Sequence, residues 1–264
     1  MIEDIRYSKN INWPLLVLFI VLMFLLLFRF DRAIAADVKE PAAVAMAGEC
    51  QQAMGGLDGW KNVKAIRFDF RVEKEGAEPR AVKHLWDRSR GRDHIEAMKD
   101  GKPMVAWVDL STKTGAAWLE GKKLEGDALK QAMDWAYGRW VNDTYWLIMP
   151  FKWMDNGVNL KKEADRDGYR ILHISFNQVG LTPGDQYWAF LNAKTHLMER
   201  WEFLLQGDKE KGTFEWKEWS DYGPVKLSSL KTTPDGKLKI HFDPLKVLDS
   251  ADASYFTQEL KPLP

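Results

Sequence analysis

The side chains best suited to metal binding or catalysis are spread along this chain of 264 residues instead of being grouped in a motif. No two histidines have the H-E-x-x-H spacing that places zinc ligands on one helix face. A metal site would have to assemble from distant segments, and the spacing gives no support for one. We predict no metal site, and histidines that are hydrogen-bonded within the fold or exposed. The five are His84, His94, His173, His196 and His241.

Nucleophiles and carboxylates show no catalytic pattern either. The chain has no G-x-S-x-G elbow and no glycine-rich phosphate loop after a predicted strand. Asp165–Gly168 starts like a calcium loop but lacks the later ligands, so we interpret it as a β-turn. Glu199 and Glu202 fall on the polar face of a predicted strand, and Cys50, the only cysteine, can form no intrachain disulfide. We predict no cofactor, and a hydrolase built from dispersed residues is the weakest of three functional alternatives.

The charge balance and the tryptophan content narrow the function classes. The 38 basic and 38 acidic residues leave no net charge, whereas nucleic-acid-binding domains normally carry a basic excess. No nucleic-acid partner is therefore predicted. The 13 tryptophans are the compositional outlier, and they fit either a tryptophan-rich core or a ligand cavity lined by indole rings.

The N-terminal region has the pattern of a membrane-spanning helix. After a polar tail at residues 1–12, Trp13–Phe28 is apolar throughout, and thirteen of its sixteen residues are Leu, Ile, Phe or Val. Insertion of these residues is favourable by on the order of −5 kcal/mol in total. With its flanking residues the segment matches a hydrocarbon core about 30 Å thick. We predict a transmembrane helix at residues 13–30, acting as an anchor or an uncleaved signal.

A cleaved signal peptide is the alternative interpretation of this region. Ala33–Ala36 contains small residues like those of a cleavage site, and cutting near Ala35 or Ala36 would give a soluble periplasmic protein. Basic residues flank the segment on both sides and do not fix its orientation. We predict an inner-membrane, single-pass protein with its main domain in the periplasm. Cys50 lacks a Leu-rich lipobox before it, so lipidation there is not expected.

Short alternating segments dominate the rest of the chain. In residues 66–72, Ile, Phe, Phe and Val alternate with charged residues, which is the pattern of an antiparallel strand with one buried face. Turn signals such as Asp100-Gly101 recur at the spacing of about 8–12 residues that is typical of antiparallel sheets or barrels. The predicted strands are 66–73, 82–86, 94–98, 104–110, 116–119, 158–164, 169–176, 186–191, 197–206, 213–219, 225–232 and 238–242.

Helical patterns occur in two places between the predicted strands. Residues 38–55 are predicted to form an amphipathic helix that stops at Gly55-Gly56. Asp127–Gly157 holds four tryptophans, and Asn142–Thr144 offers a break with a new N-cap, so two helices are expected there, the second ending at Pro150. A helical turn is expected around residues 251–259. The absence of alternating helices argues against a parallel α/β fold. We predict a mainly β (α+β) domain over residues 37–264, with a sheet wrapped around the aromatic helical segment.

These features resemble the lipoprotein-carrier superfamily of LolA and LolB. The resemblance rests on a helix leading into the strand AIRFDFRVE (Ala65–Glu73), on the antiparallel meander, and on the phrase NDTYWLIMPFKWMDNGVNL (Asn142–Leu160). It spans about Glu49 to Asp243 and implies an incomplete antiparallel β-barrel wrapped around helices, with an apolar cavity for acyl chains. In that superfamily an arginine near the cavity controls opening. The candidates for this gating role are Arg67, Arg71 and Arg92.

The leading functional hypothesis is a non-enzymatic, membrane-anchored domain that binds a hydrophobic (lipid or lipidated) ligand. A concave apolar site with few polar groups is the usual profile of a small-molecule pocket. The alternative is a barrel filled by its own side chains that serves as a structural module or binds other envelope proteins. The candidate cavity residues are Phe68, Phe70, Trp86, Trp107, Trp140, Trp146, Trp188 and Trp201.

Overall fold

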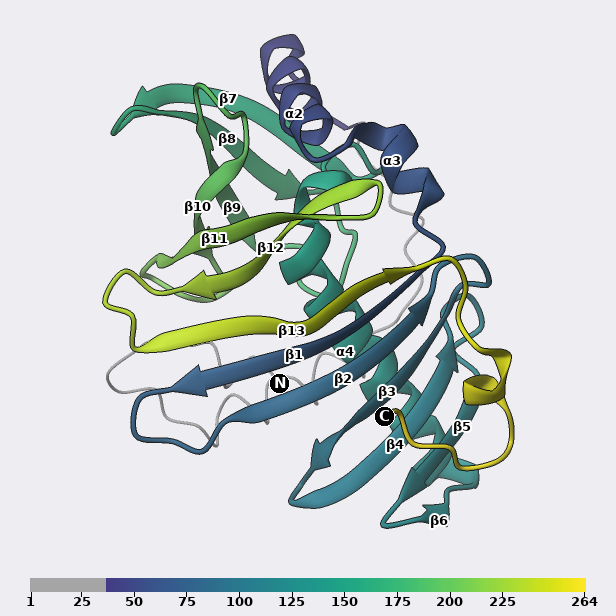
Figure 1. Cartoon of the computed structure of the whole chain (residues 1–264). Coiled ribbons are helices and arrows are strands. Elements are labelled where there is room, and N and C mark those ends of the chain that lie inside the picture. The colour runs from purple at the N-terminus through teal and green to yellow at the C-terminus, as the bar shows by residue number, and fades with distance from the viewer. Residues whose placement is uncertain (1–36) are drawn as a thin grey trace.

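The computed structural model describes residues 37–264, in which the main element is a single 13-stranded antiparallel sheet (Figure 1). The strand order is β6-β5-β4-β3-β2-β1-β13-β12-β11-β10-β9-β8-β7, so the last strand lies between the first strand and β12. The mainly β, antiparallel fold predicted from the alternating pattern is therefore confirmed. The strands are β1 (Ala65–Lys74), β2 (Arg80–Asp87), β3 (Arg92–Lys99), β4 (Lys102–Asp109), β5 (Gly115–Leu119), β6 (Lys122–Lys123), β7 (Val158–Arg166), β8 (Tyr169–Phe176), β9 (Gln186–Asn192), β10 (Met198–Leu204), β11 (Gly212–Tyr222), β12 (Val225–Thr232) and β13 (Leu238–Leu248).

Helix α4 (Gly126–Lys152) packs on the inner face of this curved sheet, and Figure 1 shows it behind β1, β2 and β13. It contacts β3, β4, β5 and β12, and its buried residues include Met133 and Ala136. Gly115 on β5 permits close packing on two sides, because a Cβ there would lie 1.9 Å from the carbonyl oxygen of Trp107 on β4 and 3.0 Å from the sulfur of Met133 on α4. The space between helix and sheet forms the main hydrophobic core.

Two shorter helices, α2 (Pro41–Ala53) and α3 (Gly56–Asn62), lie at one end of the sheet (Figure 1). Gln51 Nε2 donates a hydrogen bond of 2.8 Å to the carbonyl of Pro150, which ties α2 to the end of α4. Gly55, at the corner between α2 and α3, has a φ of 102°, and a Cβ there would lie 2.3 Å from the oxygen of Pro224. This corner therefore sits directly against the turn between β11 and β12.

The C-terminal segment covers part of the outer face of the sheet. It contains the 3₁₀ helix η1 (Ala253–Phe256), which matches the helical turn expected near residues 251–259. Trp107 Nε1 donates to the carbonyl of Thr257 at 2.6 Å, and His94 Nδ1 lies 2.8 Å from the carbonyl oxygen of Tyr255. A second, smaller hydrophobic cluster forms between this segment and β1, β2 and β4.

The aromatic segment is one continuous helix, so the predicted break at Asn142–Thr144 is wrong. The side chains there have partners other than a new helix N-terminus: Asp143 receives hydrogen bonds from Arg139, and the hydroxyl of Thr144 donates to the carbonyl of Trp140 at 2.6 Å. Pro150 lies inside the last turn and does not end the helix. Helix α3 and strand β6 were not expected from the sequence, and β13 continues to Leu248, beyond its predicted end.

The predicted transmembrane segment at residues 13–30 and the possible cleavage sites near Ala35 and Ala36 lie outside the described residues. Within residues 37–264, no helix combines the length and the apolar character needed to cross a bilayer. The assignment of residues 1–12 to a tail and of 13–30 to an anchor stays a prediction.

Candidate functional site

Six of the eight candidate cavity residues lie on the inner face of the sheet or on α4. Phe68, Phe70, Trp86, Trp146 and Trp201 are buried in the main core, and Trp140 packs against it partly buried. The rings are in direct contact: Trp146 lies 4.5 Å from Trp201, and Trp86 lies 5.8 Å from Trp140, centroid to centroid. The aromatic helix and the sheet thus face each other through large side chains, as the sequence predicted.

Trp107 and Trp188 lie on the opposite face of the sheet. Trp107 packs in the cluster beneath the C-terminal segment, and Trp188 belongs to a small outer cluster with Ile171 and Phe190. The ring of Trp188 stacks on that of His173, with 4.8 Å between the centroids, and Lys211 Nζ lies 3.3 Å from the Trp188 ring centroid. Neither residue shares the interior with the other six.

The three candidate gating arginines also lie away from the interior. Arg67 is paired with Asp69, Arg71 with Glu73 at 2.9 Å, and Arg92 with Asp87 at 3.0 Å. Arg67 and Arg71 alternate with the buried Phe68 and Phe70 on β1, and the guanidinium of Arg92 lies 4.0 Å from the ring centroid of Phe256 in η1. Their side chains therefore belong to the outer face.

The interior instead contains a buried polar cluster, the interior clamp, made of His84, Asp93, Arg139 and Asp143. His84 Nδ1 is 2.7 Å from Asp93 Oδ2, and His84 Nε2 is 2.9 Å from Asp143 Oδ2. Arg139 donates two hydrogen bonds to the same Asp143 oxygen, at 3.0 and 2.7 Å. Because His84 comes from β2, Asp93 from β3 and the other two from α4, the clamp fastens the helix to the sheet.

The clamp carries formal charges that compensate one another. Burial opposes charge on His84, but Asp93 and Asp143 favour it and raise the pKa of His84 to about 9. Burial also acts against Asp143, yet the Arg139 guanidinium keeps the pKa of this carboxyl below its usual value, whereas burial raises the pKa of Asp93. With both ring nitrogens of His84 held by carboxylates, this histidine has no free nitrogen to act as a base or to bind a metal.

The search for catalytic and metal-binding motifs did not find the clamp, although the sequence contained two signals for it. His84 alternates with Val82 and Trp86 on a face that is otherwise apolar, and Arg139 and Asp143 are spaced i, i+4 on one helix face. A histidine on a buried face needs partners, because a buried polar group without a hydrogen bond is costly. Among residues 37–264, no group of three or more His, Cys, Asp or Glu side chains is arranged to hold a metal ion.

Lys231 is a second ionisable residue in the interior. Its side chain is fully buried on β12, and its Nζ donates to the carbonyl of Ser228. The Nζ lies 4.3 Å from the ring centroid of Trp216 and 4.4 Å from that of Phe242, and none of residues 37–264 forms an ion pair with it. Burial without a compensating carboxylate lowers the pKa of Lys231 well below its usual value.

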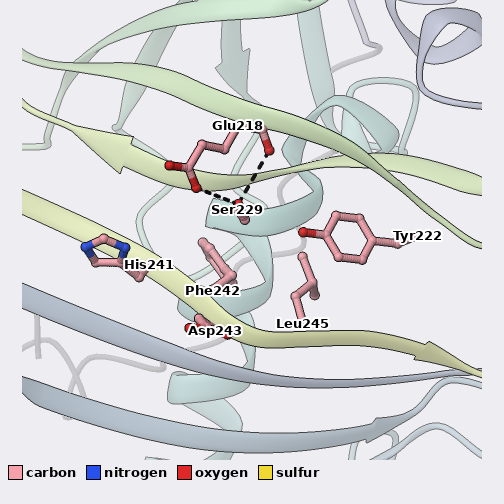
Figure 2. A pocket seen from close by; sticks show the side chains of 7 residues that line it. All are labelled: Glu218, Tyr222, Ser229, His241, Phe242, Asp243 and Leu245. Carbon is pink, nitrogen blue, oxygen red and sulfur yellow. Dashed lines mark hydrogen bonds between the residues drawn. The ribbon is translucent and has the colours of Figure 1, made fainter.

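A pocket of about 320 Å³ lies where β12 and β13 separate; we call it the β12–β13 opening. The two strands pair only from Leu230↔His241 to Thr232↔Lys239, and beyond this β13 continues along β1 alone. Figure 2 shows side chains from both sides of the gap, with helix α4 behind them. The lining residues are Glu218, Tyr222, Ser229, His241, Phe242, Asp243 and Leu245.

The opening borders directly on the aromatic interior. Phe242 and Leu245, which line it, belong to the main core, and the ring of Phe242 lies 5.8 Å from Phe68 and 5.6 Å from Phe70. Glu218 has a φ of 54°, an uncommon conformation for a residue with a side chain, and its carboxylate accepts a hydrogen bond of 3.1 Å from Ser229. The break in the strand ladder thus places a mainly polar pocket next to predicted cavity residues, with Phe242 and Leu245 buried at its base.

Solved structures that are similar to this chain include three that cover 81% of its length. A DUF1329 family protein from Desulfovibrio piger has 11% identity and a TM-score of 0.46, with 97% of that chain covered. A putative outer membrane lipoprotein-sorting protein domain from Vibrio parahaemolyticus has 10% identity and a TM-score of 0.43, with 95% covered. A LolA superfamily protein from Nitrosomonas europaea has 8% identity and a TM-score of 0.44, with 97% covered.

The structural neighbours of this chain therefore include the LolA superfamily, to which the sequence shows a resemblance. No protein-family model matches the chain, and the comparison with curated proteins gave no match.

Proposed function

We propose that this protein is a non-enzymatic, membrane-anchored binding or carrier protein for a hydrophobic (lipid or lipidated) ligand, with residues 37–264 in the periplasm. The observation that carries the proposal is the β12–β13 opening, because two of its seven lining residues, Phe242 and Leu245, belong to the main core although the rest of its lining is mainly polar. Phe242 and Leu245 connect it to Phe68 and Phe70, so an apolar chain entering there meets aromatic side chains. Its volume of about 320 Å³ falls at the lower end of the range of about 300–1,000 Å³ found for ligand pockets.

The polar atoms of the interior also favour a ligand. The indole N–H groups of Trp140, Trp201 and Trp216 are buried and have no acceptor among residues 37–264. Buried donors in native proteins nearly always have a partner, and leaving one unpaired costs about 1–3 kcal/mol. A ligand with oxygen atoms near its apolar chain supplies such acceptors.

A filled barrel that serves as a structural or protein-binding module is the second candidate. It is favoured by the close packing of the interior, where Trp153, Trp201 and Trp216 are each almost completely buried. The two candidates differ in one property: a carrier takes up a ligand through the opening, and a filled module does not.

The test uses the full chain, purified in a non-ionic detergent, and identifies bound lipids by extraction and mass spectrometry. Ser229→Trp fills the opening, and Ser220→Trp, at an exposed position of β11, is the matched control. We expect the wild type and Ser220→Trp to retain the same lipid in a fixed ratio to protein, and Ser229→Trp to lose most of it. Equal lipid in all three proteins would place it at residues 13–30 or in the detergent belt, and would favour the filled module.

The proposed location has its own test. Protease added to intact spheroplasts should digest residues 37–264, whereas protection of this region until the cells are lysed would contradict a periplasmic domain.

A further inference from the structure

We propose that the ligand is an acyl chain with an anionic oxygen headgroup, carboxylate or phosphate, and that this headgroup pairs with Lys231 behind the β12–β13 opening. This inference rests on the proposed function and adds the chemical class of the ligand. Two polar groups in the apolar interior support this assignment: the amine of Lys231 and the indole N–H of Trp216.

Lys231 is placed to meet a group that enters through the opening. Its side chain runs back along β12, so that Nζ reaches the carbonyl of Ser228, next to the pocket residue Ser229. Nζ is also 4.4 Å from the ring centroid of Phe242, which lines the pocket. The amine therefore lies one side-chain layer behind the opening.

The Lys231 amine has fewer hydrogen-bond acceptors around it than an ammonium group can use. An ammonium group has three donors, and only the Ser228 carbonyl accepts from Lys231 among residues 37–264. The faces of Trp216 and Phe242 supply the remaining contacts. Trp216 adds a buried indole N–H with no acceptor in the same part of the chain. These two donor groups next to an apolar interior favour a ligand that combines a negatively charged hydrogen-bond acceptor with an apolar tail.

The charged groups at the mouth of the opening do not supply this acceptor. Glu218 is hydrogen-bonded to Ser229, and Asp243 is exposed, so both carboxylates face solvent at the rim. Their charges are screened by salt, whereas a charge pair formed behind Phe242 is screened much less. The rim carboxylates therefore affect the rate of entry of an anion, and Lys231 determines how tightly it is held.

The interior clamp is not an alternative site for the headgroup. His84 and Arg139 are already paired with Asp93 and Asp143, and an incoming anion would have to displace one of these carboxylates. Lys231 is the buried basic residue that no carboxylate of residues 37–264 pairs with.

The experiment measures quenching of tryptophan fluorescence in the full chain, in a non-ionic detergent, by dibrominated stearic acid and by its methyl ester. Bromine quenches on contact, and Trp216 adjoins Lys231. Lys231→Met removes the amine and keeps an unbranched apolar side chain. Lys226→Met, at a lysine five positions earlier on β12 that pairs with Asp221, is the matched control. Circular dichroism verifies that both variants fold.

We expect Lys231→Met to weaken binding of the acid at least tenfold and to leave binding of the ester within about twofold, because a hydrogen bond to a charged group is lost only for the acid. Lys226→Met should bind both ligands like the wild type. A brominated lysophosphatidic acid distinguishes phosphate from carboxylate headgroups. If Lys231→Met weakens binding of this ligand more than binding of the fatty acid, the site is assigned to phosphate headgroups; if it weakens it less, the site is assigned to carboxylates.

Two outcomes overturn the inference, and they are distinguishable. If Lys231→Met binds acid and ester as the wild type does, the headgroup lies elsewhere, while the proposed function stands. If neither brominated compound quenches the tryptophan fluorescence of the wild type more than that of the Ser229→Trp variant, the proposed function fails. The headgroup assignment then fails with it.

Discussion

Replacing Asp143 with asparagine tests the interior clamp most directly. In the wild type, the protonated His84 and Arg139 face Asp93 and Asp143, so the four charges cancel. Asp143→Asn leaves two cations in a fully buried site with Asp93 as their single carboxylate. Breaking a buried ion pair by removing one partner costs about 3–5 kcal/mol, and we expect a loss of this size in the free energy of unfolding near neutral pH.

The interior clamp also makes the free energy of unfolding depend on pH. The pKa of His84 rises from 6.5 in the unfolded chain to about 9 in the folded protein, which corresponds to about 3 kcal/mol of stability. Because the folded-state pKa is the higher one, this contribution is fully present below pH 6.5 and is lost as the pH rises through about 9. Asp143→Asn removes one of the groups that raise the pKa of His84. The stability difference between wild type and variant should therefore be largest near pH 6.5 and decrease toward pH 9.5.

The assay is urea denaturation of the full chain in a non-ionic detergent, followed by circular dichroism at several pH values. Asp134→Asn, at an exposed position of the same helix, is the control, and we expect it to change the free energy of unfolding by less than about 0.5 kcal/mol. The reasoning is refuted if Asp143→Asn costs less than about 1 kcal/mol at pH 6.5, or if its stability falls with pH as steeply as that of the wild type.

Two further substitutions and one labelling experiment test other parts of the fold. Trp107→Ala removes the hydrogen bond to Thr257 and the ring contact with Phe256, so limited proteolysis should cut the C-terminal segment about tenfold faster, and an unchanged rate would show that the segment is held by other contacts. Gly115→Ala forces a Cβ against the carbonyl of Trp107 and should lower the free energy of unfolding by at least about 2 kcal/mol in urea. Burial raises the pKa of the Cys50 thiol to about 12, so a thiol reagent at pH 8 should react only after denaturation, and rapid labelling of the native protein would contradict the packing of α2.

The strands were predictable from the sequence because the alternation of apolar and charged residues is a local property. In β1, Ile66, Phe68 and Phe70 enter the core while Arg67 and Arg71 do not, as the period of two requires. The location of the aromatic helix followed from its composition. Its continuity did not, because Asn142–Thr144 has the residue types of an N-cap but makes other contacts.

The faces of Trp107 and Trp188 were not predictable because their strands carry large apolar residues on both sides. In β4, Met104, Ala106 and Val108 face the core, yet Trp107 between them also finds an apolar partner in the C-terminal segment. Alternation fixes which residues share a face but not which face is inside when both are covered. For Trp107 the C-terminal segment covers the outer face, whereas Trp188 is buried there by Ile171 and Phe190 on neighbouring positions of the sheet.

The clamp and Lys231 together explain where an anionic ligand fits in an interior that is otherwise apolar. A buried charge is tolerated when a partner compensates it, and each charged group of the clamp has such a partner within 3.0 Å. Lys231 has a carbonyl and two aromatic faces instead, so burial disfavours its ammonium form in the free protein and lowers its pKa. A ligand carboxylate or phosphate changes that balance, because it supplies the counter-charge that makes the ammonium stable. Uptake of an acidic ligand should therefore bind a proton from solution, whereas uptake of its ester should not, and calorimetry in two buffers of different ionisation enthalpy separates the two cases.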